Sequence, residues 1–205
     1  MLELYTWKTP NGRKVPILLA ELGWPCVLYL VNLGENEQKS PEYLAKNPNG
    51  KIPALVDQDE GVVVFESGAI LEYLADKAGR FLPAREERHA RWEVLSWVYW
   101  QVGGPGPMFG QLGSFAREKP QDGHAFQKFR EEARRLVGVL DGHLRSKNRE
   151  WIGAEYSIAD IINYPWFEAV AGFQPDVLDG ADAVKAWMKR MAARPAVKKG
   201  MALEV

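Results

Sequence analysis

Apolar and polar positions follow two different periodicities along the chain. Up to about residue 80, short apolar runs rich in Val, Leu, Tyr and Phe alternate with polar turns, which predicts β-strands at residues 2–6, 27–32, 54–56 and 62–65. Apolar residues at steps of three and four predict helices at residues 13–22 and 67–78, and a glycine follows each of them. A short helix is expected to begin in the polar segment at Ser40-Pro41-Glu42.

After residue 87 the pattern is helical throughout. Its clearest apolar stripe runs from residue 125 to residue 144, where apolar side chains recur at steps of three and four. Ser157 and Asp160 have the spacing of a capping box, so we interpret both as residues that start a helix and stabilise the fold rather than as catalytic groups. A run of glycines and prolines at residues 103–107 breaks what would otherwise be one long helix.

The predicted order β-α-β, short α, β-β-α at the start of the chain is that of thioredoxin-like domains. We therefore expect an α/β domain over residues 1–80, a linker at residues 81–87 and an all-helical domain over residues 88–205. A chain of 205 residues suits one or two domains and buries roughly 70% of its unfolded surface. The predicted fold class is α/β plus all-α.

The formal net charge of -1 gives no basic footprint for nucleic acid or for an anionic membrane surface. No segment approaches the roughly 18 apolar residues of a membrane-spanning helix, and the N-terminus lacks the pattern of a signal peptide. We expect a cytoplasmic protein that binds neither nucleic acid nor membranes.

Cys26 is the only cysteine, which excludes an intramolecular disulfide and a Cys-x-x-Cys redox pair. Its position between Trp24-Pro25 and an apolar run favours a small core or strand-edge residue over a reactive thiol. Any redox chemistry must therefore use a sulfur brought by a bound molecule. The three histidines, His89, His124 and His143, show no metal-ligand spacing with one another or with Cys26, so we expect no metal.

The stretch from residue 47 to residue 70 has features that suit an anionic, thiol-bearing peptide. Ile52 precedes Pro53 and is held extended, so its backbone can pair with a peptide that lies alongside as an extra strand. Ser67 stands where a helix begins, and the free N–H groups at such a position attract a carboxylate. Glu66 can bind an α-amino group. Glutathione is a peptide with a carboxylate and an ammonium group at one end and a neutral middle, so it can bind all of these groups at once.

Two runs in this stretch, Lys51-Ile52-Pro53-Ala54-Leu55 and Phe65-Glu66-Ser67-Gly68-Ala69-Ile70, resemble the glutathione-binding half of the cytosolic glutathione transferases. Thr9-Pro10-Asn11-Gly12 and the segment at residues 100–108 make the chain similar to the nu class of that superfamily, the bacterial glutathione-dependent disulfide-bond reductases. The resemblance covers nearly the whole chain. It implies a thioredoxin-like glutathione-binding domain followed by an all-helical domain, a cis peptide bond before Pro53, and a homodimer.

The same resemblance implies which residues act. Thr9 would donate a hydrogen bond to the sulfur of bound glutathione, assisted by Asn11, so both are expected to be catalytic. The expected glutathione-binding residues are Gln38, Lys51, Ile52, Pro53, Glu66, Ser67 and Lys128. Lys51 is expected at the glycine carboxylate, and either Lys128 or Arg130 is expected to reach the ligand from the helix at residues 125–144.

The free energy needed to lower the pKa of the glutathione thiol shows which groups such a site requires. Lowering a thiol pKa from about 8.5 to about 6.5 takes about 2.7 kcal/mol. A hydrogen bond to a charged group contributes about 1.5–3 kcal/mol, and a helix N-terminus contributes roughly 0.3–2 kcal/mol. One donor together with the helix suffices, whereas the helix alone does not. The alternative for Thr9-Pro10-Asn11-Gly12 is an ordinary turn and helix cap, which these residue types also favour.

Three activities remain open at this point. The preferred one is glutathione-dependent reduction of small disulfides, because thiol–disulfide exchange needs only an activated thiolate and an aligned disulfide. The alternatives are conjugation of glutathione to an electrophile and a non-enzymatic, glutathione-binding regulator of the same fold. The break at residues 103–107 is expected to widen a cleft at the subunit interface. Phe109, Tyr164 and Trp166 are candidates for its wall, with the helical core as the alternative location.

Overall fold

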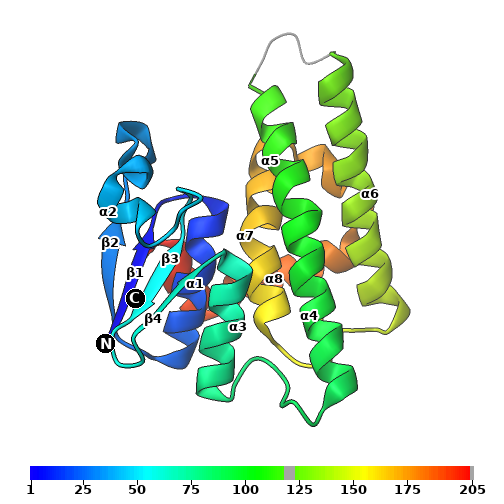
Figure 1. Ribbon diagram of the computed structural model, residues 1–205. Coiled ribbons are helices and arrows are strands. Elements are labelled where there is room, and N and C mark those ends of the chain that lie inside the picture. Colours follow the sequence, from blue (N-terminus) through cyan, green and yellow to red (C-terminus); the bar gives the residue numbers. More distant parts are fainter. Residues whose placement is uncertain (118–122, 204–205) are drawn as a thin grey trace. The chain divides into compact units, whose positions relative to one another are not determined.

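The computed structural model describes residues 1–117 and 123–203. The chain forms two compact units (Figure 1): unit 1 combines Met1–Arg80 with the segment from Arg194 onward, and unit 2 is Phe81–Ala193. The strands of the described chain all belong to unit 1, and the described part of unit 2 is helical. In these described ranges, no helix is both long and apolar enough to cross a membrane.

Unit 1 is built on a four-stranded mixed sheet with the strand order β2-β1-β3-β4. Strand β1 runs parallel to β2 and antiparallel to β3, and β3 pairs antiparallel with β4. The strands are β1 Leu2–Thr6, β2 Cys26–Leu30, β3 Ala54–Asp57 and β4 Val62–Phe65. The helical elements are α1 Pro10–Leu22, η1 Leu33–Glu35, η2 Glu37–Lys39, α2 Pro41–Leu44, α3 Ser67–Ala78 and α9 Pro195–Met201. This confirms the predicted thioredoxin-like domain.

The core of unit 1 forms where the sheet meets helices α1 and α3. Leu4 of β1 and Leu55 of β3 are fully buried and lie directly opposite each other in the sheet. Strand β1 alternates buried and partly exposed positions, as the two-residue period of a strand requires. Strand β2 ends at Leu30, before the predicted residue 32, because its partner strand β1 ends at Thr6, which is opposite Leu30.

The ends of α1 follow from its capping residues. The helix begins at Pro10 rather than at residue 13, because the side-chain oxygen of Thr9 accepts a hydrogen bond from the N–H of Gly12. Pro10 occupies the first turn, where a missing N–H is tolerated. Gly23 ends the helix in the left-handed conformation with a φ of 67°. Helix α3 has the predicted bounds.

Helix α9 packs against α1. At Gly200, an added Cβ atom would lie 2.4 Å from the backbone of Ile17, so only glycine allows this approach. The guanidinium group of Arg194, just before α9, donates two hydrogen bonds to the carboxylate of Glu21, at 2.7 and 2.9 Å. Helix α9 thus belongs to unit 1 by packing, whereas the sequence assigns it to the domain at residues 88–205. The domain boundaries around the linker at residues 81–87 stay a prediction.

Unit 2 contains helices on both sides of the predicted break. Its elements are α4 Arg88–Gly103, α5 Pro105–Phe115, α6 His124–Ser146, α7 Ile158–Phe173, η3 Pro175–Leu178 and α8 Asp182–Ala193. At Gly104 the backbone leaves the helical conformation, with φ -117° and ψ -90°, and α5 starts at the following proline. The glycine- and proline-rich run therefore separates α4 from α5, as predicted.

Helix α7 begins with the predicted capping box. The Ser157 side chain accepts a hydrogen bond from a backbone N–H of the first turn, and the buried Asp160 carboxylate accepts one from the Ser157 N–H at 3.0 Å. Asp160 also accepts hydrogen bonds from the N–H of Ile152 and from the indole of Trp187, each at 2.9 Å. Burial nevertheless raises the pKa of Asp160 to about 6. These contacts support the interpretation of Ser157 and Asp160 as folding residues.

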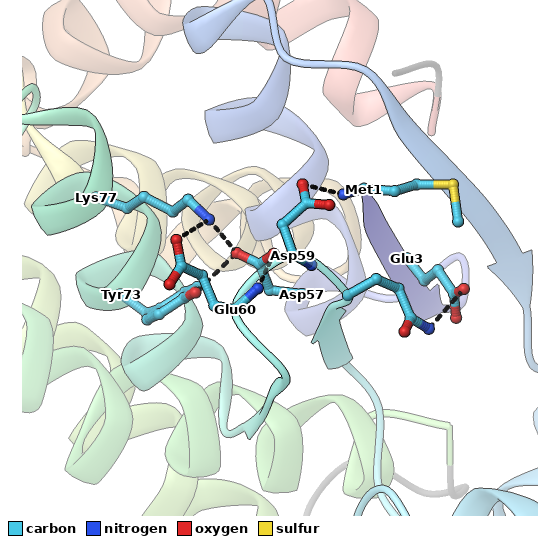
Figure 2. A network of polar contacts seen from close by, with 8 residues as sticks. Met1, Glu3, Asp57, Asp59, Glu60, Tyr73 and Lys77 are labelled. Atoms are coloured by element: carbon cyan, nitrogen blue, oxygen red, sulfur yellow. Dashed lines mark hydrogen bonds and ion pairs between the residues drawn. The ribbon is translucent and has the colours of Figure 1, made fainter.

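The end of strand β3 carries a polar network that ties the sheet to α3 (Figure 2). The Asp57 carboxylate is fully buried, accepts a hydrogen bond from the Tyr73 hydroxyl at 2.7 Å, and forms an ion pair with Lys77. The backbone N–H of Asp59 also donates to it, at 3.2 Å. Burial opposes ionisation, but the hydrogen bonds from Lys77 and Tyr73 prevail and hold the pKa of Asp57 at about 2.

Candidate functional site

Thr9 lies at the N-terminus of α1, where it makes the cap described above. Its hydroxyl oxygen uses a lone pair to accept the N–H of Gly12 at 3.2 Å, and this leaves the O–H hydrogen to be donated to an acceptor outside the helix. Asn11 follows as the second residue of α1 and is partly buried. Thr9 therefore forms the helix cap that was predicted as the alternative. The same hydroxyl can still donate its hydrogen to the sulfur of a bound thiol.

Gly12 brings strand β1 and the Thr9 turn together. Its carbonyl oxygen accepts a hydrogen bond from the buried Thr6 hydroxyl at 2.8 Å. An added Cβ atom would lie 2.0 Å from the carbonyl oxygen of Trp7, so a side chain cannot be placed here. The sequence marks Gly12 only as part of a turn, because its close contact with the end of β1 depends on the tertiary fold.

The turn before β3 presents a well-supported backbone. The Ile52-Pro53 peptide bond is cis, which confirms the expectation from the resemblance. The carbonyl oxygen of Lys51 accepts two hydrogen bonds, one from the Tyr43 hydroxyl at 2.6 Å and one from the Asn47 side-chain amide at 2.7 Å. Because this carbonyl precedes Ile52, the two donors hold the peptide unit whose N–H belongs to Ile52.

Tyr43 and Asn47 were missed as site residues by the sequence analysis. Tyr43 is buried on the short helix α2, and burial raises its pKa, so its hydroxyl remains a donor at neutral pH. Asn47 is also buried and accepts the N–H of Asn49 at 3.0 Å, which closes the turn. The Asn-Pro-Asn-Gly composition signals a turn, but nothing local reveals that a tyrosine from α2 completes it.

Glu66 and Ser67 lie at the start of α3, as predicted. Glu66 is exposed and has a φ of 72° and a ψ of 120°, a conformation that costs a non-glycine residue about 1–3 kcal/mol. Ser67 is the first residue of the helix and is 7% exposed. The N–H groups of this first turn lack partners within the helix and attract anions. A strained backbone of this kind at a helix N-terminus is typical of a ligand-binding site.

Lys14 joins these two helix starts. Lys14 is 1% exposed, and its amino group donates a hydrogen bond to the Ser67 hydroxyl at 3.2 Å. Burial lowers the pKa of Lys14 to about 7, while the Glu66 carboxylate acts in the opposite direction. Lys14 was not predicted as a site residue from the sequence. Its spacing of three and four residues from Ile17 and Leu18, which places a lysine on the apolar face of α1, was a signal that could have identified it.

Gln38 and Lys51 lie in the polar segment and turn that precede β3. The Oε1 atom of Gln38 is buried and has no hydrogen-bond partner among the described residues, so a ligand N–H would satisfy it. The exposed side chain of Lys51 is suited to a carboxylate in solvent. Thr9, Asn11, Gln38, Lys51, Ile52, Pro53, Glu66 and Ser67 all belong to unit 1.

Lys128 belongs to unit 2, where it is exposed on α6. It lines a cavity of about 360 Å³ together with Met108, Phe129, Glu131, Glu132 and Arg135. Arg130, the other candidate on this helix, donates to the Asp176 carboxylate at 2.9 Å within unit 2. Lys128 is therefore the better of the two candidates, and its contact with a ligand stays a prediction.

The aromatic candidates for a pocket wall fall mainly in the helical core. Phe109 is fully buried and packs edge-to-face on Phe167, with ring centroids 5.3 Å apart. Tyr164 is buried against Trp187. Trp166 is partly buried, next to Gly106 and Gly110 of α5. Phe109 and Tyr164 therefore lie in the helical core, the alternative location expected from the sequence.

Cys26 is the first residue of β2 and is half-buried. Burial raises the pKa of its thiol to about 11, so the thiol is protonated at neutral pH and is a poor nucleophile. This agrees with the interpretation of Cys26 as a strand-edge residue. Within the part of the chain that the structure describes, no group of three His, Cys, Asp or Glu residues is arranged to hold a metal ion.

Comparison with known proteins gives consistent matches over both parts of the chain. The family model described as "Glutathione S-transferase, N-terminal domain" matches residues 1–76, and the one described as "Glutathione S-transferase, C-terminal domain" matches residues 107–195. Disulfide-bond oxidoreductase YfcG of Escherichia coli (strain K12) is 43% identical over 208 residues, which covers 98% of this chain and 94% of the relative.

Two solved structures show the same fold with ligands. A glutathione transferase from Burkholderia graminis, with two glutathione molecules bound per subunit, is 42% identical with a TM-score of 0.91, covering 98% of this chain and 87% of that one. A glutathione transferase from Pseudomonas putida, with one glutathione disulfide bound per subunit, is 38% identical with a TM-score of 0.90, covering 98% of this chain and 90% of that one.

Proposed function

The chain belongs to the glutathione S-transferase family, and from this premise we propose that it is a glutathione-dependent disulfide-bond reductase of the nu class. The observation that carries the proposal is the Thr9 cap, which leaves a hydroxyl hydrogen for the glutathione sulfur in a protein whose only cysteine is a protonated strand-edge residue. The identity with a named disulfide-bond oxidoreductase supports the same activity.

In the proposed binding mode, different groups of unit 1 bind successive parts of glutathione. The backbone of Ile52, supported by Tyr43 and Asn47, pairs with the backbone of the cysteinyl residue, as in strand addition. The start of α3, with Ser67 and Glu66, binds the carboxylate and the ammonium of the γ-glutamyl end.

At the other end of glutathione, Lys51 binds the glycine carboxylate. The Oε1 atom of Gln38, which has no partner in the part of the chain that the structure describes, accepts an N–H of the ligand. Lys128 of unit 2 adds a positive charge. Because lysine offers a point charge rather than the two-pronged donor of arginine, its contribution is expected to be modest.

The chemistry is a double exchange. The thiolate of the first glutathione, stabilised by the Thr9 hydroxyl and assisted by Asn11, attacks one sulfur of the substrate disulfide. A mixed disulfide with glutathione forms, and the other half of the substrate leaves as a thiolate that takes up a proton. A second glutathione thiolate attacks the glutathione sulfur of the mixed disulfide. Glutathione disulfide forms, and the second half of the substrate leaves as a thiol. Two glutathione molecules are oxidised for each disulfide reduced.

We include a homodimer in the proposal. Large apolar side chains are exposed on two elements that suit an interface: Val63 and Phe65 on β4, 48% and 40% exposed, and Trp92 and Tyr99 on α4, 63% and 59% exposed. Apolar exposure on this scale is expected to be covered in the assembled protein. The cytoplasmic location expected from the sequence also stays a prediction.

The experiment is a comparison of activities in one preparation. Reduction of hydroxyethyl disulfide with glutathione is expected to exceed conjugation of a chloronitrobenzene, and the Cys26→Ser variant is expected to keep the reductase activity because the protein contributes no reactive sulfur. Dominant conjugation would overturn the proposal in favour of a transferase. Binding to immobilised glutathione without either activity would identify a binding protein instead.

A further inference from the structure

The buried Lys14 connects the two helices that begin at the proposed site, because its amino group on α1 donates to Ser67 on α3. Lys14 is among the largest fully buried side chains of the protein. It lies five positions beyond Thr9 on α1, or about 7.5 Å along the helix axis, and it contacts Ser67 at the first position of α3. Burying an amino group is unfavourable unless it makes hydrogen bonds, and the contact with Ser67 is one such hydrogen bond.

We propose that Lys14 is a positioning residue for glutathione: by donating to the Ser67 oxygen, it orients the Ser67 hydroxyl so that its hydrogen points to the γ-glutamyl carboxylate of the ligand. This inference rests on the proposed glutathione site and names a residue that acts on it through another side chain. Lys14 itself is 1% exposed and does not need to touch the ligand.

The chemistry of a hydroxyl group supports this role. A serine hydroxyl can accept hydrogen bonds through its oxygen and donate one through its hydrogen. The Lys14 amino group donates into the Ser67 oxygen at 3.2 Å, so an accepting position is occupied and the hydroxyl is favoured as a donor. A donor at the first turn of a helix, where backbone N–H groups also point outward, is complementary to a carboxylate.

The positive charge of Lys14 also favours a carboxylate at this site. The Glu66 carboxylate favours the charged form of Lys14, which opposes the effect of burial on the Lys14 pKa. In its ammonium form Lys14 has N–H donors and no acceptor, so in that form the hydrogen bond runs from the lysine nitrogen to the Ser67 oxygen. Replacing the buried lysine by an apolar side chain of similar length is expected to preserve the fold, because the apolar side chain avoids the cost of burying an amino group.

The test is a double-mutant cycle on the dissociation constant of glutathione, measured by titration calorimetry with the full-length protein. Lys14→Met keeps the length and removes the donor, and Ser67→Ala removes the hydroxyl. Each is expected to weaken glutathione binding about tenfold. The double variant is expected to be no weaker than the weaker single variant, because both changes remove the same oriented donor. Lys14→Arg, which keeps N–H donors, is expected to restore binding to within about threefold of the wild type.

Wild-type affinity in Lys14→Met, or losses that multiply to about a hundredfold in the double variant, would overturn the inference, since an additive pattern is that of two independent structural effects. If Lys14→Met does not fold, Lys14→Gln carries the same test, because its amide ends one bond short of the amino group and loses the contact. Absence of glutathione binding by the wild-type protein would instead reject the proposed function. The two failures are therefore distinguishable.

Discussion

The Tyr43 hydroxyl donates a hydrogen bond to the carbonyl oxygen of Lys51 at 2.6 Å, and this contact supports the turn that ends in the cis peptide bond before Pro53. A side chain from the short helix α2 thereby positions the backbone of Ile52, which is proposed to pair with glutathione. The consequence can be measured by removing only the hydroxyl.

Tyr43→Phe is expected to raise the KM for glutathione about three- to tenfold and to lower the free energy of unfolding by about 1 kcal/mol, the usual contribution of one hydrogen bond. The loss is partial because the Asn47 amide still donates to the same carbonyl. Tyr5→Phe is the matched control, since the Tyr5 hydroxyl donates to the Glu3 side chain. An equal rise of KM in both variants would contradict the assigned role of Tyr43.

Thr9→Ala is expected to lower kcat for disulfide reduction about 10- to 100-fold, because a hydrogen bond to a thiolate contributes about 1.5–3 kcal/mol. The pKa of bound glutathione, followed by thiolate absorbance, is expected to rise. The variant also loses a helix cap, which costs about 1 kcal/mol of stability. Thr9→Ser keeps the hydroxyl and is expected to restore both properties. Unchanged turnover in Thr9→Ala would remove Thr9 from the mechanism.

Asp57 is expected to control acid stability. Its pKa is about 2 in the folded protein against an ordinary value of 3.8, so its contribution is fully present above about pH 4 and is lost as the pH falls toward 2. Asp57→Asn is expected to lower the free energy of unfolding at pH 7 by about 1–2 kcal/mol, after allowance for solvent screening, and the difference from the wild type is expected to disappear as the pH falls through 2.

Denaturant unfolding at a series of pH values measures this difference. The control is Asp59→Asn, which removes an exposed ion pair with the N-terminus and is expected to change stability by less than about 0.5 kcal/mol. A difference between Asp57→Asn and the wild type that does not shrink as the pH falls would show that Asp57 acts through packing rather than through its charge.

Two glycine substitutions are expected to have opposite effects. Gly200→Ala places a methyl group against the backbone of Ile17 and is expected to destabilise the protein by about 1–3 kcal/mol, because α9 must move away from α1. Gly138→Ala, inside α6, meets nothing within 4 Å and is expected to stabilise the protein by about 0.5–1 kcal/mol through helix propensity. Thermal melting checks both, and a stable Gly200→Ala would show that the contact between α1 and α9 is loose.

Much of the fold was predictable because its signals are local. The strands at residues 2–6 and 62–65 and the helix at residues 67–78 have the predicted bounds, since alternation, helical spacing and a terminal glycine each act over a few residues. The capping box of Ser157 and Asp160 was predicted for the same reason. The start of α1 was placed at residue 13 because the cap by Thr9 was not used to set the helix boundary.

The sequence by itself determined the order of the elements, the turn before Pro53 and the residues at the start of α3, all of which depend on neighbours along the chain. Only the tertiary structure decided the partners of buried polar groups: Lys14 with Ser67, Tyr43 with Lys51, and Arg194 with Glu21. A buried polar group must find a hydrogen-bond partner, and packing rather than distance along the chain determines which partner is near.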